Sequence, residues 1–258
     1  MNNFQFRDNI PYAVKIQKGK RRITIIGDSF STGHGIKKVE NRFANILRKK
    51  FPDAEIHVAA LNGLNSQTEL NSLKTMQARG YEFDIIILAY CLNDIDYLVP
   101  KSLEIDTRIK SFNSQLSFLE KNSYFINTFS FRYFASQDPD FMSYSNFVLD
   151  GYENDESWEY HKSTLRGIKK FTQDLNKPLV VVTFPFLQEK IENYTFLEAH
   201  KKLNAFWKNE NVAHLNLLRT FEPHLGEKLV VNKYDAHPNE YANQLAADAI
   251  YFYLFQNK

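Results

Sequence analysis

Short apolar runs rich in β-branched residues alternate along this chain with longer stretches of helical periodicity. Alternation of this kind is typical of a parallel sheet covered by helices on both faces, because parallel strands need crossover connections. Five of the runs are predicted to be strands, at residues 22–27, 55–60, 84–90, 179–184 and 211–217. The third and fourth are almost entirely apolar, as strands buried on both faces are. We therefore predict an α/β fold with one doubly wound, five-stranded parallel sheet of flavodoxin-like order 2-1-3-4-5.

The connection between the third and fourth predicted strands is abnormally long. It runs from Cys91 to Pro178, although a parallel crossover needs only about a dozen residues. A loop of that length without secondary structure of its own is uncommon inside a domain, so we expect this insertion to contain helices. Within it, residues 97–160 are richer in aromatic side chains than the 15% of the whole chain.

These aromatic side chains have two interpretations. They can fill a small core of their own, or they can wall a substrate site as part of a lid. Tyrosines such as Tyr97, Tyr124 and Tyr133 suit either use, since their rings are apolar and their hydroxyls are polar. We treat residues 1–258 as a single domain and residues 97–160 as a candidate lid or insertion within it.

Composition and charge exclude several classes of protein. The chain has 32 basic and 30 acidic residues, a net charge of +2, which argues against a nucleic-acid partner or a strongly basic membrane-surface protein. The basic residues clustered between Lys15 and Arg22 are expected to be solvated rather than to bind phosphate. Cys91 is the single cysteine, so the fold cannot depend on an internal disulfide.

Membrane insertion is not expected for this chain. No apolar run approaches the roughly 20 residues of a membrane span, and the polar first residues lack the apolar segment of a signal peptide. We therefore expect a soluble chain, with an extracytoplasmic location if a signal or an anchor precedes it.

Chemically capable residues follow the predicted strands directly. Ser29 follows the first strand, Gly63 the second and Asn93 the third, whereas Asp235 and His237 precede the last helix. Ligands of open parallel sheets bind outside the carboxyl ends of the strands, so these side chains should lie at one edge. A hydroxyl nucleophile, a base of near-neutral pKa, a carboxylate and two hydrogen-bond donors are the parts of an acyl-transfer site.

Each residue taken alone also has a structural interpretation. Ser29 could cap a helix, Asn93 could form an Asx turn and Gly63 could occupy a turn of positive φ. His237 could be a surface histidine before a proline. Their shared position at one sheet edge favours the catalytic interpretation.

Four blocks of the sequence resemble those of the SGNH, or GDSL-type, hydrolases. They are Gly-Asp-Ser at 27–29, the lone Gly63, Asn93 with Asp94, and Asp-x-His-Pro-Asn at 235–239. The resemblance spans the chain from Arg22 to its end. Bacterial members of the family are frequent, and their usual final block is Asp-x-x-His. Here Tyr234 stands three residues before the histidine and the aspartate stands two before it.

The resemblance implies a role for each candidate residue. Ser29 is the nucleophile and His237 is the general base, oriented by Asp235 or, if Asp235 points away, by a backbone carbonyl. The backbone N–H of Ser29, together with Gly63 and Asn93, forms the oxyanion hole. No metal and no cofactor are implied.

Other ligand motifs are not apparent. Gly33-His34-Gly35 is not a dinucleotide fingerprint, no phosphate-binding Gly-x-x-x-x-Gly-Lys occurs, and the seven histidines show no His-x-x-x-His spacing. We therefore predict neither a metal site nor a bound cofactor.

The predicted function is that of a serine ester hydrolase acting on a small-molecule or glycan ester. It would remove an acyl group, such as an O-acetyl group on a glycan or the acyl chain of a lipid-like ester. An acyltransferase that uses the same acyl-enzyme is the nearest alternative. A catalytically idle glycan-binding domain of the same fold is the alternative outside enzymes.

Overall fold

The computed structural model describes residues 1–122, 126, 130–131, 133–134, 136–137, 140, 144–189, 191–232 and 235–256. Tyr124 and Tyr234, singled out in the sequence, lie outside these residues. The chain divides into two units, a sheet unit of residues 1–94 and 162–258 and an inserted unit of residues 95–161.

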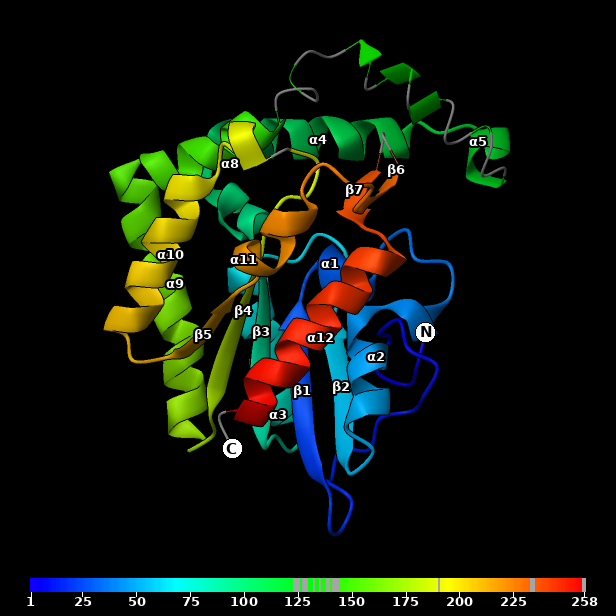
Figure 1. Cartoon of the computed structure of the whole chain (residues 1–258). Coiled ribbons are helices and arrows are strands. Elements are labelled where there is room, and N and C mark those ends of the chain that lie inside the picture. Colours follow the sequence, from blue (N-terminus) through cyan, green and yellow to red (C-terminus); the bar gives the residue numbers. More distant parts are fainter. Residues whose placement is uncertain are drawn as a thin grey trace. The chain divides into compact units, whose positions relative to one another are not determined.

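The sheet unit contains the predicted parallel sheet, with strand order β2-β1-β3-β4-β5 (Figure 1). The fold class and the strand order are therefore confirmed. The strands are β1 (Arg21–Gly27), β2 (Ala54–Ala60), β3 (Ile85–Cys91), β4 (Leu179–Phe184) and β5 (Ala213–Asn216). The edge strand β5 begins later than predicted because Asn211, with a φ of 53°, belongs to the turn that ends the preceding helix.

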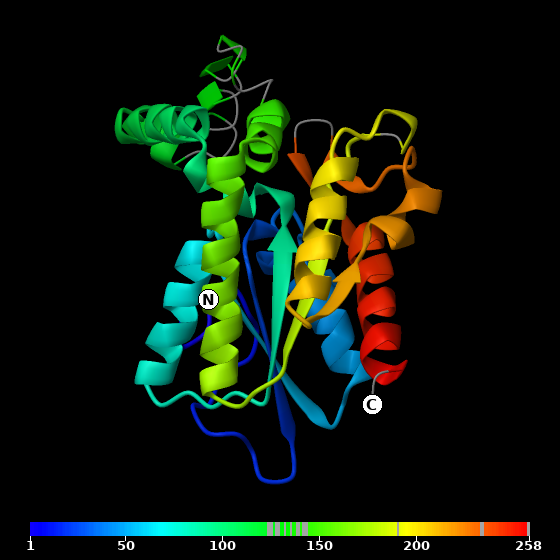
Figure 2. The same cartoon turned by 90° about the vertical axis from the view of Figure 1, so that its left-hand side faces the viewer.

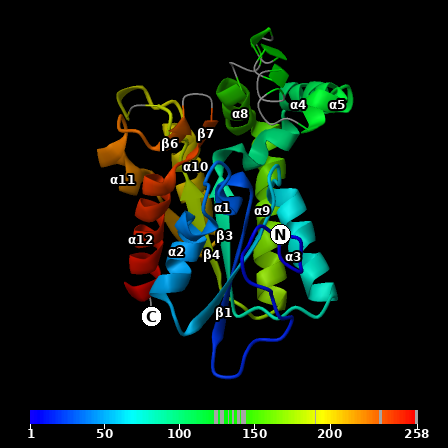
Figure 3. The ribbon, with the colours of Figure 1, turned by 90° about the vertical axis from the view of Figure 1, so that its right-hand side faces the viewer.

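Helices cover both faces of this sheet. Figures 2 and 3 show α2, α10 and α12 on one face and α3 and α9 on the other. Their bounds are α2 (Phe43–Lys50), α3 (Ser66–Ala78), α9 (Asp155–Asp174), α10 (Leu197–Asn209) and α12 (Glu240–Gln256). With both faces covered, every residue of β4 is buried. No helix of the described residues is long and apolar enough to cross a membrane.

Shorter elements connect these helices and strands. The helical ones are α1 (Ser29–Thr32), α11 (Leu218–Phe221) and the 3-10 turns η1 (Val39–Asn41), η2 (Leu92–Leu98), η3 (Ile191–Asn193) and η4 (Glu222–His224). A second, two-stranded sheet pairs β6 (Val230–Asn232) with β7 (Asp235–Pro238) in antiparallel orientation. The sequence does not predict this hairpin, because strands of three and four residues carry too little periodicity.

The inserted unit is helical, as its length led us to expect. It contains α4 (Pro100–Ser114), α5 (Phe118–Asn122), α8 (Tyr144–Glu153) and the first turns of α9. Tyr152 and Trp158 pack with ring centroids 5.7 Å apart. Gly151 allows α8 to approach Ile95 and Val99, since a Cβ at this position would lie 3.1 to 3.3 Å from their side chains. Part of the aromatic content therefore forms a core within the unit itself.

A buried ionic cluster anchors the N-terminal segment to the sheet unit. The side chain of Asp8 is fully buried and accepts from Arg42 Nη2 and Arg48 Nη2, each at 2.8 Å. The hydroxyl of Tyr12 also donates to this carboxylate. Burial opposes the charged form, but the hydrogen bonds and the two positive charges outweigh it and lower the pKa of Asp8 to about 2.

This cluster predicts a pH-dependent contribution to stability. A carboxylate whose pKa falls from 3.8 to about 2 on folding contributes about 2 kcal/mol above pH 4, which is lost as the pH falls toward 2. Asp8→Asn should therefore lower the free energy of unfolding at pH 7 by about 2 kcal/mol or more, because two arginines lose their counter-charge. Urea unfolding at a series of pH values measures this. The difference in the free energy of unfolding between Asp8→Asn and wild type should shrink below pH 4. Asp53→Asn, at an exposed site, should change neither the free energy of unfolding nor its dependence on pH.

Candidate active site

The turn after β1 is built to present Ser29. Asp28 is the N-cap of α1, and its Oδ1 accepts from the backbone N–H of Phe30 at 2.9 Å. Gly27 must lack a side chain, since a Cβ there would lie 2.4 Å from Ser31 Oγ and 2.9 Å from the carbonyl oxygen of Ala89. Because Asp28 is the N-cap, Ser29 is the first residue of α1. Backbone N–H groups at this position have no acceptor within the helix.

Ser29, His237 and Asp235 form one line of hydrogen bonds. The Nε2 atom of His237 lies 2.9 Å from Ser29 Oγ. On the other side of the ring, Nδ1 lies 2.6 Å from Asp235 Oδ1. The structure thus brings together the three residues that the sequence suggested as nucleophile, base and acid.

The Asp-x-His spacing follows from the hairpin. Asp235 and His237 lie on the short strand β7, and residues two apart on a strand point to the same face. The carboxylate therefore reaches the imidazole and also accepts from the backbone N–H of His237, at 3.1 Å. A strand at this point accounts for a spacing one residue shorter than the Asp-x-x-His of the family that the sequence resembles.

The two carboxyl groups near Ser29 have pKa values shifted in opposite directions. For Asp235, burial opposes ionisation but the hydrogen bonds and charge of His237 outweigh it, so the pKa is lowered. For Asp28, burial raises the pKa even though Phe30 and Ser29 donate hydrogen bonds to it. Asp28 Oδ2 lies 3.3 Å from Ser29 Oγ. The hydroxyl of Ser29 therefore has two acceptors within reach, of which His237 Nε2 is the nearer.

The predicted oxyanion donors follow β2 and β3. Gly63, with a φ of 76°, lies in an exposed turn before α3. Asn93 is half-buried in η2 and donates a side-chain hydrogen bond to Asp28. The turn that carries Asn93 is fixed by Asp94, whose Oδ2 accepts from the backbone N–H of Cys91 at 3.2 Å. Sequence reasoning did not anticipate that Asp28 orients Asn93.

His34 is a second histidine at this site. Its ring centroid lies 4.4 Å from that of His237, and its Nε2 lies 3.9 Å from Asp235 Oδ2. Burial and the positive charge of His237 lower the pKa of His34. The sequence places His34 close to Ser29 along the chain, but nothing in it indicates that His34 faces Asp235.

Glu69 is a buried carboxyl behind the nucleophile turn. It is 0% exposed, and neither of its oxygens has a hydrogen-bond partner among the described residues. Burial, and secondarily the negative charge of Asp28, raise its pKa well above 4.5. A sequence signal exists, because Glu69 precedes the buried Leu73 and Met76 by four and seven residues and so shares their face of α3.

Comparison with known proteins identifies the fold. The sequence matches no protein-family model and no curated protein. Solved structures are similar over 92% of the chain, among them the esterase EstA from Pseudoalteromonas sp., inhibited by monoethylphosphonate, with 16% identity, a TM-score of 0.54 and 98% of that chain covered. A catalytic mutant of the acetylxylan esterase Axe2 from Geobacillus stearothermophilus has 14% identity, a TM-score of 0.55 and 96% coverage. The chain has the fold of the GDSL esterases.

A longer protein shares this fold. A two-domain esterase active on acetylated mannans, co-crystallized with mannopentaose, matches 92% of the chain with 16% identity and a TM-score of 0.55. The chain spans only 50% of that protein. These likenesses apply to the fold, and the chemistry of the site rests on its own residues.

The environment of Glu69 generates a stability prediction. A carboxyl whose pKa is raised in the folded chain contributes its full stability below the ordinary value of 4.5 and loses it as the pH rises toward the folded value. Glu69→Gln keeps the shape without an acidic proton. We expect the variant to gain stability relative to wild type as the pH rises, measured by denaturant unfolding between about pH 4 and pH 9. A difference independent of pH would contradict this, and Glu222→Gln, at an exposed site, is the control.

Proposed function

We propose that this chain is a serine ester hydrolase that works through an acyl-enzyme. The observation that carries the proposal is the line of hydrogen bonds from Ser29 Oγ through the imidazole of His237 to Asp235, at 2.9 and 2.6 Å. Nucleophile, base and orienting acid in this order are the arrangement of Ser-His-Asp hydrolases.

Acylation is the first half of the reaction. Ser29 Oγ attacks the ester carbonyl carbon while His237 Nε2 accepts the hydroxyl proton. Asp235 holds the proton on Nδ1, which leaves Nε2 free as the base, and stabilises the imidazolium that forms. The negative oxygen of the tetrahedral intermediate is received by the N–H groups of Ser29 and Gly63 and by the amide of Asn93. The intermediate collapses, His237 returns the proton to the leaving alcohol, and the acyl group stays on Ser29.

Deacylation repeats these steps with water. His237 Nε2 removes a proton from a water molecule, which attacks the acyl carbon, and the same three donors receive the oxyanion. His237 then protonates Ser29 Oγ as the carboxylic acid leaves. Asn93 suits its part because its hydrogen bond to Asp28 fixes the amide before substrate arrives.

A glycan O-acetyl ester is the substrate class that we propose. The fold relatives include an esterase active on acetylated mannans and an acetylxylan esterase. The inserted unit also contains a cavity of about 400 Å³. Its lining combines three aromatic rings with a carboxylate, a hydroxyl and an amide, from Phe112, Tyr133, Phe134, Glu120, Ser130 and Gln137.

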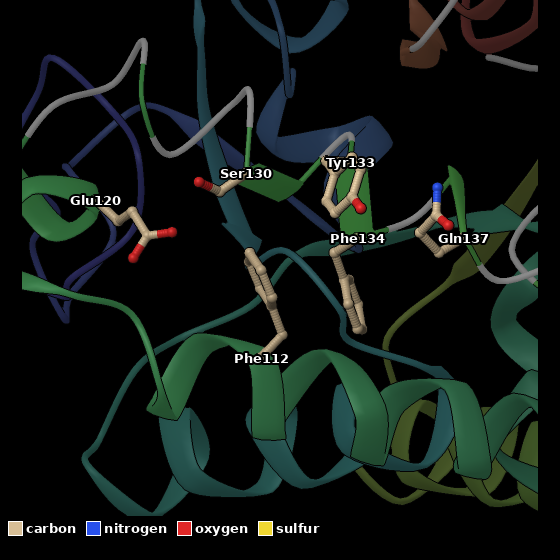
Figure 4. A pocket seen from close by; sticks show the side chains of 6 residues that line it. All are labelled: Phe112, Glu120, Ser130, Tyr133, Phe134 and Gln137. Atoms are coloured by element: carbon tan, nitrogen blue, oxygen red, sulfur yellow. The ribbon is translucent and has the colours of Figure 1, made fainter.

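The geometry of this cavity suits a sugar ring. Phe112 and Phe134 are stacked, with centroids 4.6 Å apart and an interplanar angle of 19° (Figure 4). Tyr133 is 65% exposed although it is a large aromatic residue. Pyranose rings have faces of C–H groups that pack on aromatic rings and hydroxyls that bond to polar side chains at the edge. We propose on this basis that the inserted unit, the candidate lid, binds a glycan through this cavity.

Loss of the Ser29 hydroxyl or of the His237 imidazole should abolish activity. Ser29→Ala and His237→Ala are each expected to lower kcat for p-nitrophenyl acetate by about 10⁴-fold or more, because nucleophile and base act as a unit. Circular dichroism should report an unchanged fold. Ser31→Ala, which removes a neighbouring hydroxyl without a role in the line, is the matched control and should stay within a few fold of wild type.

A fluorophosphonate probe gives the complementary measurement. Covalent labelling mapped to Ser29 in wild type and absent in Ser29→Ala supports an active serine. Failure of the folded wild-type chain to label would favour the idle glycan-binding domain. Transfer of the acetyl group to an added sugar, in preference to water, would favour the acyltransferase.

The cavity of the inserted unit should affect glycan substrates alone. Tyr133→Ala removes an exposed aromatic face, worth about 1 kcal/mol in a stacked contact, and should raise KM for acetylated xylo- or manno-oligosaccharides by roughly fivefold to tenfold. The KM for p-nitrophenyl acetate should not change. Tyr160→Ala, at an exposed tyrosine outside the cavity lining, is the control. Equal changes for both substrates would contradict the glycan role.

A further inference from the structure

Three metal-binding side chains converge beside the nucleophile. His34, Asp235 and His237 each offer one ligand atom, and these atoms lie within 4.8 Å of one another. All three are accessible, with exposed side-chain fractions of 46%, 21% and 27%. His34 comes from the turn after α1 and the others from β7, so no short sequence spacing reveals the cluster.

The two oxygens of Asp235 face different histidines. Oδ1 is held by the imidazole and backbone N–H groups of His237. Oδ2 faces Nε2 of His34 at 3.9 Å. Two ligands of a tetrahedral Zn²⁺ lie about 3.3 Å apart, as bond lengths near 2.0–2.1 Å require. A contraction of about 0.6 Å would therefore let both atoms bind one ion.

A hydrogen-bond chain holds the ring of His34. Thr32 Oγ1 donates to Asn62 Oδ1 at 2.5 Å, and Nδ2 of the same amide lies 2.9 Å from His34 Nδ1. Thr32 Oγ1 is also 2.9 Å from the carbonyl oxygen of Ser29, and it has one proton to give. If the Asn62 amide turns by 180°, that proton goes to Ser29 instead, the Thr32 hydroxyl accepts from the Asn62 NH₂ group and the amide oxygen accepts from His34 Nδ1–H.

In this turned state Nε2 of His34 has a lone pair directed at Oδ2 of Asp235, 3.9 Å away. A cation bound between these two atoms would stabilise that state. An imidazole whose other nitrogen donates to a fixed oxygen is also the usual state of a histidine bound to zinc. Close approach is possible because Gly35 has no side chain, since a Cβ there would lie 3.0 Å from Asp235 Oδ2.

We propose that His34, Asp235 and His237 bind Zn²⁺ and that the bound ion reversibly inhibits the enzyme. Two imidazoles and one carboxylate are a donor set that zinc prefers, and three protein ligands leave its fourth position to water. The zinc site depends only on this geometry. The inhibition rests on the proposed esterase function.

Either ring nitrogen of His237 leads to inhibition. If Nε2 binds the ion, it can no longer accept the proton of Ser29. If Nδ1 binds it, the neutral ring must hold its proton on Nε2, which again cannot act as the base. The second oxygen of Asp235 is drawn to the ion in both cases.

Zinc binding is tested independently of activity. Isothermal titration of the Ser29→Ala chain with ZnCl₂ should show one ion per chain. Adding His34→Ala should weaken binding by more than tenfold, and Asn62→Ala by about 10- to 100-fold, as loss of a supporting partner does. His224→Ala, which removes a surface histidine paired with Glu227 at 3.2 Å, should leave the affinity unchanged. Affinity that survives His34→Ala would overturn the site.

Inhibition is tested on the chain with Ser29 intact. Zn²⁺ should reduce p-nitrophenyl acetate hydrolysis, and EDTA should restore it. The zinc concentration for half-inhibition should rise more than tenfold in His34→Ala, each variant being compared with its own zinc-free rate. Activation by Zn²⁺, or inhibition that is equal in His34→Ala, would overturn the inhibitory role. If the zinc-free chain hydrolyses no ester while titration still shows the His34-dependent ion, the esterase function fails and the zinc site stands.

Discussion

The parallel register of β1, β2 and β3 determines where the nucleophile and the predicted oxyanion donors lie. Gly27 at the end of β1 is paired with Ala60 in β2 and with Ala89 in β3. The chain therefore leaves β1 and β2 at the same level and β3 two residues further on, after Cys91. The turns that follow carry Ser29, Gly63 and Asn93. Chemistry is concentrated here because the covered sheet leaves only its edges free for polar loops. Gly27 adds a further restriction, since a side chain at this position would collide with Ser31 and with the backbone of β3.

Much of this arrangement could be predicted from the sequence. Strand order follows from the alternation of apolar runs and helical stretches, and the position of Ser29 follows from its place after the first run. Asp235 was the uncertain member because the expected spacing to His237 is three residues. The short strand β7 explains how Asp235 reaches His237 with a spacing of two residues. Its pairing with β6 could not be predicted, because strands this short have no recognisable sequence pattern.

Buried polar side chains were the features that local pattern could not reveal. Arg22 is the last residue of the basic cluster that the sequence predicts to be solvated. Its side chain is nevertheless 0% exposed, and its Nη2 lies 2.7 Å from Glu55 Oε2. It also donates to the carbonyl oxygens of Val14 and Lys15, at 3.0 and 2.7 Å. Burial of such a group becomes favourable only when distant segments supply partners together. The partnership of His34 with Asp235 is hidden for the same reason.

The proposed machinery is divided between very different parts of the fold. Ser29 is fixed to the end of a central strand, whereas the base and the acid lie on a hairpin with strands of three and four residues. A two-stranded hairpin has few hydrogen bonds to lose and opens at a lower free energy than a buried sheet. Opening of this hairpin alone separates His237 from Ser29 while the sheet persists. The temperature of inactivation is then set by the hairpin of β6 and β7, and it lies below the temperature at which the sheet unfolds.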